Sequence, residues 1–156
     1  MKKYLSLLFV ALFATMTLAL SSCIDDNNDT IDPEVGAPEL NIDGKTYKFN
    51  RATPNVTNDV YSCTVWNSQN SDGRLIVSIY QWASTDKSTT LTYDNLEVTW
   101  NNKSHLIMGH PTAASTTKVL AKSATSITLQ FKNAEFENTA GDEKFTVNGI
   151  ITLPVE

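Results

Sequence analysis

Three tryptophans stand next to amide side chains, and this combination of residues could bind sugars. Asparagine follows Trp66 and Trp100, and glutamine precedes Trp82. An exposed aromatic ring offers a flat apolar surface to a sugar ring, and neighbouring amides can hydrogen-bond to its hydroxyl groups. The alternative is that the rings belong to a small β core and that the asparagines serve turns. Trp66, Trp82 and Trp100 are therefore candidate ligand-binding residues.

The side chains that could catalyse a reaction or bind a metal ion lack a suitable spacing. Cys63 alternates with apolar neighbours, and His105 and His110 lie in a different segment, so we expect a buried, inert thiol. The two histidines do not have a spacing that puts a pair of ligands on one strand face. We find no convincing carboxylate pair for glycoside hydrolysis, and no Gly-x-Ser-x-Gly or phosphate-binding motif occurs. The sequence therefore predicts no enzymatic activity, no metal site and no cofactor.

The segments that would carry these residues are predicted to be β-strands. Apolar residues alternate with polar ones through most of residues 39–156, with no convincing helical period. Asp43-Gly44 between alternating apolar residues predicts a tight hairpin. The frequent turn residues favour an antiparallel β-sandwich or barrel of about 8–10 short strands. The fold class predicted for this region is therefore all-β, with both architectures left open.

Changes in the alternation predict where the strands bend. The apolar positions change parity at Asp94-Asn95 and again near Asn133, and a bulge or turn at each place would keep both sets facing one core, Tyr93 included. The small and polar residues 110–117 are expected to form a loop. Residues 74–83 are apolar on both faces, which predicts a central strand that is covered on both sides or lines a cavity.

The first 22 residues have the layout of an export signal. Lys2 and Lys3 precede a nearly continuous apolar run from Leu5 to Leu20, and small residues then lead to Cys23. The apolar run of about 16 residues is shorter than the ~20 that a membrane-spanning helix needs. We therefore expect residues 1–22 to be a signal peptide and not a transmembrane helix.

The motif Leu20-Ser21-Ser22-Cys23 resembles the lipobox of bacterial lipoproteins. The resemblance implies cleavage before Cys23, diacylglycerol on its thiol and acylation of the new amino terminus. Two or more acyl chains anchor a protein stably, whereas one chain anchors it only marginally. The expected mature chain is residues 23–156, with the membrane as a partner through lipid on Cys23.

Residues 23–38 are acidic and contain few large apolar residues, which predicts a disordered tether. Their first part, residues 24–29, resembles the surface-export signal of Bacteroidetes lipoproteins, in which acidic residues follow the lipidated cysteine. The chain as a whole resembles the small, uncharacterised Bacteroidetes lipoproteins with an all-β domain. These resemblances imply an outer-membrane, lipid-anchored protein that faces the cell exterior, with a periplasm-facing position as the alternative.

The net charge makes nucleic acid an unsuitable partner. The whole chain has 12 basic and 17 acidic residues, and removing the signal peptide with its two lysines leaves 10 minus 17, or −7. Such a charge repels nucleic acid and anionic lipid head groups, and no cluster of Lys or Arg along the sequence reverses it locally. With Cys23 lipidated, Cys63 has no partner for an intrachain disulfide.

These observations lead us to expect a non-catalytic binding module for a glycan or another extracellular ligand. One alternative is an accessory subunit of a surface assembly that recognises protein through an exposed sheet edge. A second is a carrier of a small apolar ligand inside a barrel, suggested by the two-faced strand at residues 74–83. Exposed tryptophans would favour the first function, and a closed barrel with a cavity would favour the last.

The substitution Cys23→Ala tests the proposed anchor. Because the thiol would carry the lipid, the variant is expected to leave the membrane fraction and to keep its signal peptide uncleaved at this position. The measurement is membrane fractionation of cells together with the mass of the protein. A variant that stays in the membrane fraction with unaltered processing would contradict the lipoprotein prediction.

Overall fold

The computed structural model describes residues 38–69, 73–103 and 106–156. Cys23, which is the expected lipidation residue, the predicted signal peptide, nearly all of the predicted tether and His105 lie outside these residues. Within the described residues, no helix is both long enough and apolar enough to cross a membrane.

The described chain forms an antiparallel sheet of eleven strands, which confirms the all-β prediction. The strands are β1 (Glu39–Ile42), β2 (Lys45–Lys48), β3 (Arg51–Thr57), β4 (Val60–Trp66), β5 (Gly73–Tyr80), β6 (Thr90–Leu91), β7 (Leu96–Asn102), β8 (Leu106–Pro111), β9 (Thr116–Lys122), β10 (Ser126–Glu137) and β11 (Lys144–Pro154). A short 3₁₀ helix, η1 (Trp82–Ser84), follows β5.

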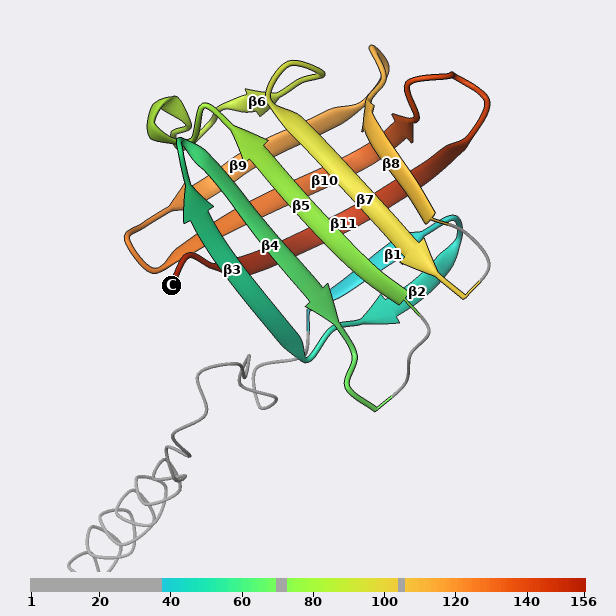
Figure 1. Ribbon diagram of the computed structural model, residues 1–156, viewed down its shortest axis with the longest axis horizontal. Helices are drawn as coiled ribbons and strands as arrows, with labels where there is room; N and C mark the ends of the chain where they lie inside the picture. The colour runs from blue at the N-terminus through green and yellow to red at the C-terminus, as the bar shows by residue number, and fades with distance from the viewer. Residues whose placement is uncertain (1–37, 70–72, 104–105) are drawn as a thin grey trace, which may run out of the picture.

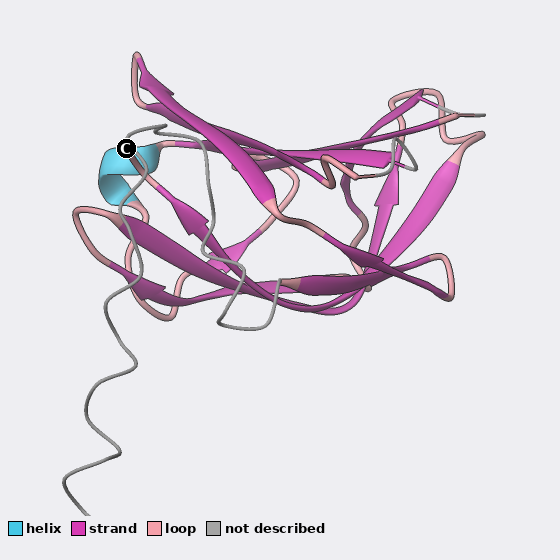
Figure 2. Cartoon of the chain, turned by 90° about the horizontal axis from the view of Figure 1, so that it is seen from below, coloured by secondary structure: helices cyan, strands magenta, loops and turns pink. Residues whose placement is uncertain are grey.

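The sheet curls on itself into a half-barrel. Its strand order is β2-β1-β11-β10-β8-β7-β5-β4-β3, with β9 paired to β10 and to β6. Figure 1 shows β3, β4, β5 and β7 crossing in front of β9, β10 and β11. Figure 2 shows the resulting two layers one above the other, with η1 in cyan at one end. The architecture thus combines the facing layers of a sandwich with the continuous sheet of a barrel.

The space between the layers is filled by side chains at alternating positions of the strands. In β4 and β5, every inward-facing residue is fully buried: Tyr61, Cys63, Val65, Leu75, Val77 and Ile79. Aromatic rings from the back layer meet them, and Phe136 stacks on Phe145 with ring centroids 5.2 Å apart. Burying a large apolar side chain contributes roughly 1.5–3 kcal/mol, so this alternation stabilises the curled sheet.

The hairpin predicted at Asp43-Gly44 is confirmed. Asp43 and Gly44 join β1 to β2 with positive φ values of 50° and 81°, and Ile42 pairs directly with Lys45. Positive φ at both central residues defines a type I′ turn, whose twist matches that of the flanking strands. The Asn41 side-chain oxygen also accepts a hydrogen bond of 3.0 Å from the Gly44 N–H.

The bulge predicted near Asn133 is also confirmed. The pairing of β10 with β11 shifts register between Phe131 and Ala134, and Asn133 has a φ of 46°. The Asn133 N–H donates a 2.7 Å hydrogen bond to the side-chain oxygen of Asn148 on β11. Because the bulge restores the parity, Phe131, Ala134 and Phe136 are all buried.

The expectation that Tyr93 faces the core is wrong, because its side chain is 56% exposed. A tight turn lies here, and the Leu96 N–H donates to the Thr92 carbonyl over 2.9 Å. The side-chain oxygen of Asn95 accepts a second bond, of 2.7 Å, from the Thr92 N–H. This turn directs Leu91 and Leu96 into the core and leaves Tyr93 outside.

Two further expectations are corrected by the structure. His110 belongs to strand β8 and not to a loop, since β8 continues to Pro111 and β9 starts only at Thr116. Strand β5 is central in its layer but is covered on one face only. Its outward residues Ile76 and Tyr80 are only partly buried, so they neither contact a second layer nor line an internal cavity.

Gly149 is expected to be a position where a methyl group destabilises the fold. Its φ is 133°, and an added Cβ would lie 2.9 Å from Leu40 Cδ2 and 3.1 Å from the Glu39 carbonyl oxygen. Gly149→Ala should lower the free energy of unfolding by about 3 kcal/mol through strain and overpacking. Urea unfolding measures this value.

Gly44→Ala is the matched control. Gly44 also has a positive φ, 81°, but nothing lies within 4 Å of its added Cβ. Gly44→Ala should therefore lower the free energy of unfolding only through backbone strain, by about 1–2 kcal/mol. Equal losses in the two variants would show that the contact between β11 and β1 is not tight.

Candidate functional site

Trp100 belongs to the core and not to an exposed binding surface. Its side chain is 2% exposed, and its ring packs edge-on against Tyr47 with centroids 4.7 Å apart. Gly73 makes room for this ring, because a Cβ at residue 73 would lie 2.1 Å from the Cη2 atom of Trp100. A sugar therefore has no access to the Trp100 ring, although the asparagines that follow it reach the surface.

Trp82 is half-buried in η1 and is held by several contacts. Its ring stacks on Tyr61 at 4.6 Å, and the Lys122 ammonium lies 3.8 Å from the ring centroid. The same ammonium donates hydrogen bonds of 2.6 and 2.8 Å to the carbonyls of Trp82 and Thr85. Burial lowers the pKa of Lys122, an effect that Asp86 and Asp59 partly oppose. Trp82 thus ties η1 to the sheet.

Trp66 is partly exposed and lines an open cleft. The cleft has a volume of about 730 Å³ and is lined by residues 66–69, 73–74 and 101–103; we call it the Trp66 cleft. Trp66 is the last residue of β4 and points outward, opposite to the buried Val65. The cleft contains the amide side chains of Asn67, Gln69, Asn101 and Asn102.

The strand register brings these residues together from three segments of the chain. Trp66 pairs with Arg74 across β4 and β5, and Arg74 pairs with Asn101 across β5 and β7. Trp66 and Asn101, which are far apart in sequence, are therefore both neighbours of Arg74 at one end of the sheet. The structure thus joins two of the three amide-flanked motifs, those at Trp66 and Trp100, and leaves the one at Trp82 elsewhere.

Hydrogen bonds order the loop that carries the amides. The Asn50 side-chain oxygen accepts a 2.8 Å bond from the Ser68 N–H, and the Asn67 side-chain oxygen accepts a 2.9 Å bond from the Gln69 N–H. The guanidinium carbon of Arg74 lies 5.9 Å from the centroid of the Trp66 ring. Such a cation–π contact at an exposed site is weak.

A second, smaller cleft adjoins the Trp66 cleft. Its volume is about 220 Å³, it is lined by residues 45–49, and it shares Asn67 and Gly73 with the Trp66 cleft. Basic residues that lie apart in the sequence line these two clefts. Lys45 and Lys48 line the smaller cleft and Arg74 lines the Trp66 cleft, so the two adjoining clefts bring together residues from β2 and β5.

A separate cleft at the other end of the sheet was not predicted from the sequence. Its volume is about 660 Å³, and Tyr93 and His110 line it with ring centroids 4.4 Å apart. The His110 Nδ1 lies 3.2 Å from the Leu96 carbonyl oxygen, and its Nε2 lies 3.9 Å from a Glu97 oxygen. No signal in the sequence indicated this surface, because Tyr93 shares the parity of the buried Leu91.

The surroundings of Cys63 are those of an unreactive thiol. It is fully buried, and burial raises the pKa of the thiol from about 9 to about 11. Its neighbour Tyr61 is equally buried and donates a 2.8 Å hydrogen bond to the Pro154 carbonyl, and burial raises the pKa of this phenol too. In the part of the chain that the structure describes, no three His, Cys, Asp or Glu side chains are grouped to hold a metal ion.

Comparison of the chain with protein-family models, with curated proteins and with solved structures gave no significant match.

The raised pKa of Cys63 predicts how stability depends on pH. Below about pH 9 the thiol is protonated in both states, and between pH 9 and 11 the unfolded state loses its proton first. The free energy of unfolding should therefore fall as the pH rises through this range, by at most about 1.4 kcal/mol per pH unit for this group. Cys63→Ala should reduce the fall between pH 8 and pH 10 by about 1 kcal/mol in urea unfolding.

Thiol labelling gives an independent check on the same residue. A thiol reagent at pH 8 should modify Cys63 only after urea is added, as peptide mapping of the labelled chain would show. Rapid labelling of the native protein at residue 63, or an unchanged pH dependence in Cys63→Ala, would contradict the inert assignment.

Proposed function

We propose that this protein is a non-catalytic, lipid-anchored binding module that binds a glycan in the Trp66 cleft. The observation that carries the proposal is the convergence of one partly exposed tryptophan and four amide side chains in one open cleft. These groups come from separate loops and strand ends, and their meeting has no evident role in the core.

The chemistry of the cleft suits a sugar. The indole of Trp66 is a rigid apolar surface on which the C–H face of a sugar ring can stack. The amides of Asn67, Gln69, Asn101 and Asn102 are both donors and acceptors, as sugar hydroxyl groups are. A volume of about 730 Å³ lies in the range of small-molecule sites and leaves room for more than one sugar unit.

The sequence of the N-terminal segment supports a location for this module. The lipobox ending at Cys23 and the acidic run that follows it favour an outer-membrane protein facing the cell exterior. A glycan outside the cell is a ligand that such a protein would meet.

A protein partner is a second candidate, favoured by the surface of β8. Leu106 and Met108 are 66% and 57% exposed and point outward from the same face of this strand. In the described part of the chain, β8 pairs with β10 only through His110 and Pro111, so the rest of that edge has no strand beside it. An accessory subunit could use such an edge to bind another protein.

The carrier alternative has less support, because the inward face of β5 is packed among core side chains. Leu75, Val77 and Ile79 are all fully buried within the hydrophobic cluster. The clefts described above open to solvent at the ends of the sheet, and the largest of them is more polar than apolar.

Trp66→Ala tests the proposed site. The full-length protein, in a detergent without a sugar head group, is titrated with galactan, xylan, pectin and chondroitin sulfate oligosaccharides by isothermal calorimetry. A bound oligosaccharide should lose at least about tenfold in affinity in the variant, because the stacking surface is gone. Unchanged thermal unfolding would establish that the variant is folded.

The matched control is Tyr93→Ala, which removes an exposed ring from the other cleft. It should leave the affinity unchanged. Failure of the whole panel to bind, or equal losses in the two variants, would contradict the proposal that the Trp66 cleft binds a glycan.

A further inference from the structure

We infer that the Trp66 cleft binds an acidic glycan, one that carries sulfate or carboxylate groups. The inference rests on the proposed function and adds the chemical class of the ligand. It comes from the charged side chains that line the Trp66 cleft and the cleft at residues 45–49, whose sign is opposite to the net charge of the whole chain. A further cleft that shares Asn102 carries Asp43, Asp142 and Glu143 beside Lys144, so the basic surface ends there.

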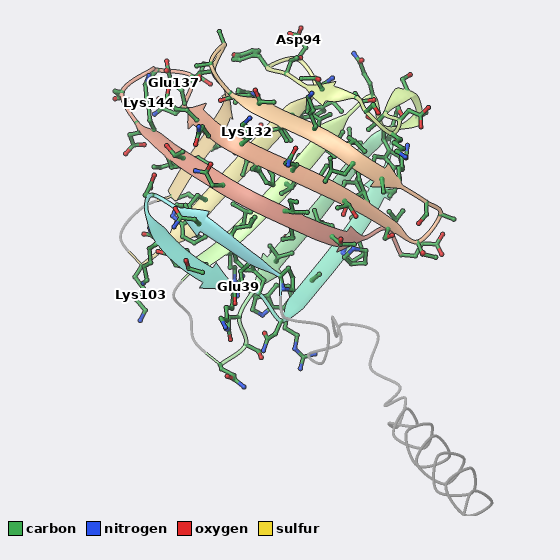
Figure 3. All side chains as sticks on the ribbon, turned by 180° about the vertical axis from the view of Figure 1, so that it is seen from behind. Glu39, Asp94, Lys103, Lys132, Glu137 and Lys144 are labelled. Carbon is green, nitrogen blue, oxygen red and sulfur yellow. The ribbon has the colours of Figure 1, made fainter. Side chains whose placement is uncertain are left out.

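The charged side chains that line the Trp66 cleft and the adjoining cleft are all basic in the described part of the chain. They are Lys45, Lys48, Arg74 and Lys103. Glu39 stands just outside and pairs with Lys48 at 2.8 Å, and this carboxylate raises the pKa of Lys48. Figure 3 shows Glu39 and Lys103 at the same end of the molecule.

Arg74 and Lys45 are the two cations on which the inference depends. Among the described residues neither forms an ion pair, and each lies over an aromatic ring instead. The Arg74 guanidinium carbon is 5.9 Å from the Trp66 ring centroid, and the Lys45 ammonium is 4.9 Å from that of Tyr47. An exposed cation–π contact is weaker than a charge-assisted hydrogen bond, so an anion can draw each cation away from its ring.

The continuity of the two clefts favours a ligand of several sugar units. Trp66 and Tyr47 lie in the two clefts that share Asn67 and Gly73, so the clefts are continuous. A chain that crosses both would place one ring near each aromatic residue. Its acidic substituents would then meet Arg74 and Lys45, and a guanidinium can bind sulfate or carboxylate through two parallel hydrogen bonds.

The test compares glycans that differ only in charge. The full-length protein in detergent is titrated with a sulfated galactan and with the same galactan after desulfation, and also with polygalacturonate and its methyl ester. Each acidic member should bind at least about tenfold more tightly than its neutral form at low salt. The difference should shrink as sodium chloride is added, because exposed charges are screened.

Variants connect this difference to the two cations. Arg74→Gln and Lys45→Gln should each lower the affinity for the acidic glycan severalfold and leave the affinity for the neutral glycan unchanged. Lys132→Gln is the control, since Lys132 is an exposed lysine on β10 in the back layer, away from Lys103 in Figure 3. Lys132→Gln makes the same change in net charge and should leave the affinity for both glycans unchanged.

The outcomes separate this inference from the proposed function. The acidic and neutral forms could bind equally tightly, with Trp66→Ala lowering the affinity for both. This result would support a glycan site in the Trp66 cleft and contradict the inference that its ligand is acidic. Equal effects of Lys132→Gln and Arg74→Gln would also overturn it, as would equally tight binding of a single-stranded oligonucleotide. If no glycan binds, the proposed function itself fails.

Discussion

The half-barrel depends on one strand that belongs to both layers. Along one edge β10 pairs with β11, and along its other edge it pairs first with β9 and then, through Phe136 and Glu137, with β8. The bulge at Asn133 lies between these two stretches and supplies the bend that carries the chain from one layer towards the other. Without this change of neighbour the two layers would not belong to one sheet.

The candidate site follows from the same sheet. The front layer must direct Val65, Leu75 and Trp100 inward, because these residues form the core. The residues next to them, Trp66, Arg74 and Asn101, therefore all point outward in one row across three strands. The row lies where the strands end, so loops rich in amides border it. The core pattern thus determines where the cleft lies, while the loop residues determine its chemistry.

Local patterns were sufficient to predict the strands, the Asp43-Gly44 hairpin and the Asn133 bulge, because each depends on neighbours in sequence. Tyr93 and the outer face of β5 could not be predicted, since apolar residues obey the same alternation whether or not another layer covers them. For the site, the amides beside Trp66 were a usable signal. The burial of Trp100 and the approach of Lys45 to the Trp66 cleft could not be predicted, because both depend on contacts between strands that are distant in sequence.

The position of the first strand has a mechanical consequence. The described domain begins beside the cleft: the Phe49 N–H donates to the Pro38 carbonyl, and the Asn50 N–H donates to the Trp66 carbonyl over 3.1 Å. If the chain is tethered at Cys23 as proposed, tension between the anchor and a ligand held at Trp66 would pass through these few bonds. Most of the half-barrel would then carry no load, and the resistance to pulling would be set by this short path and not by the stability of the whole sheet.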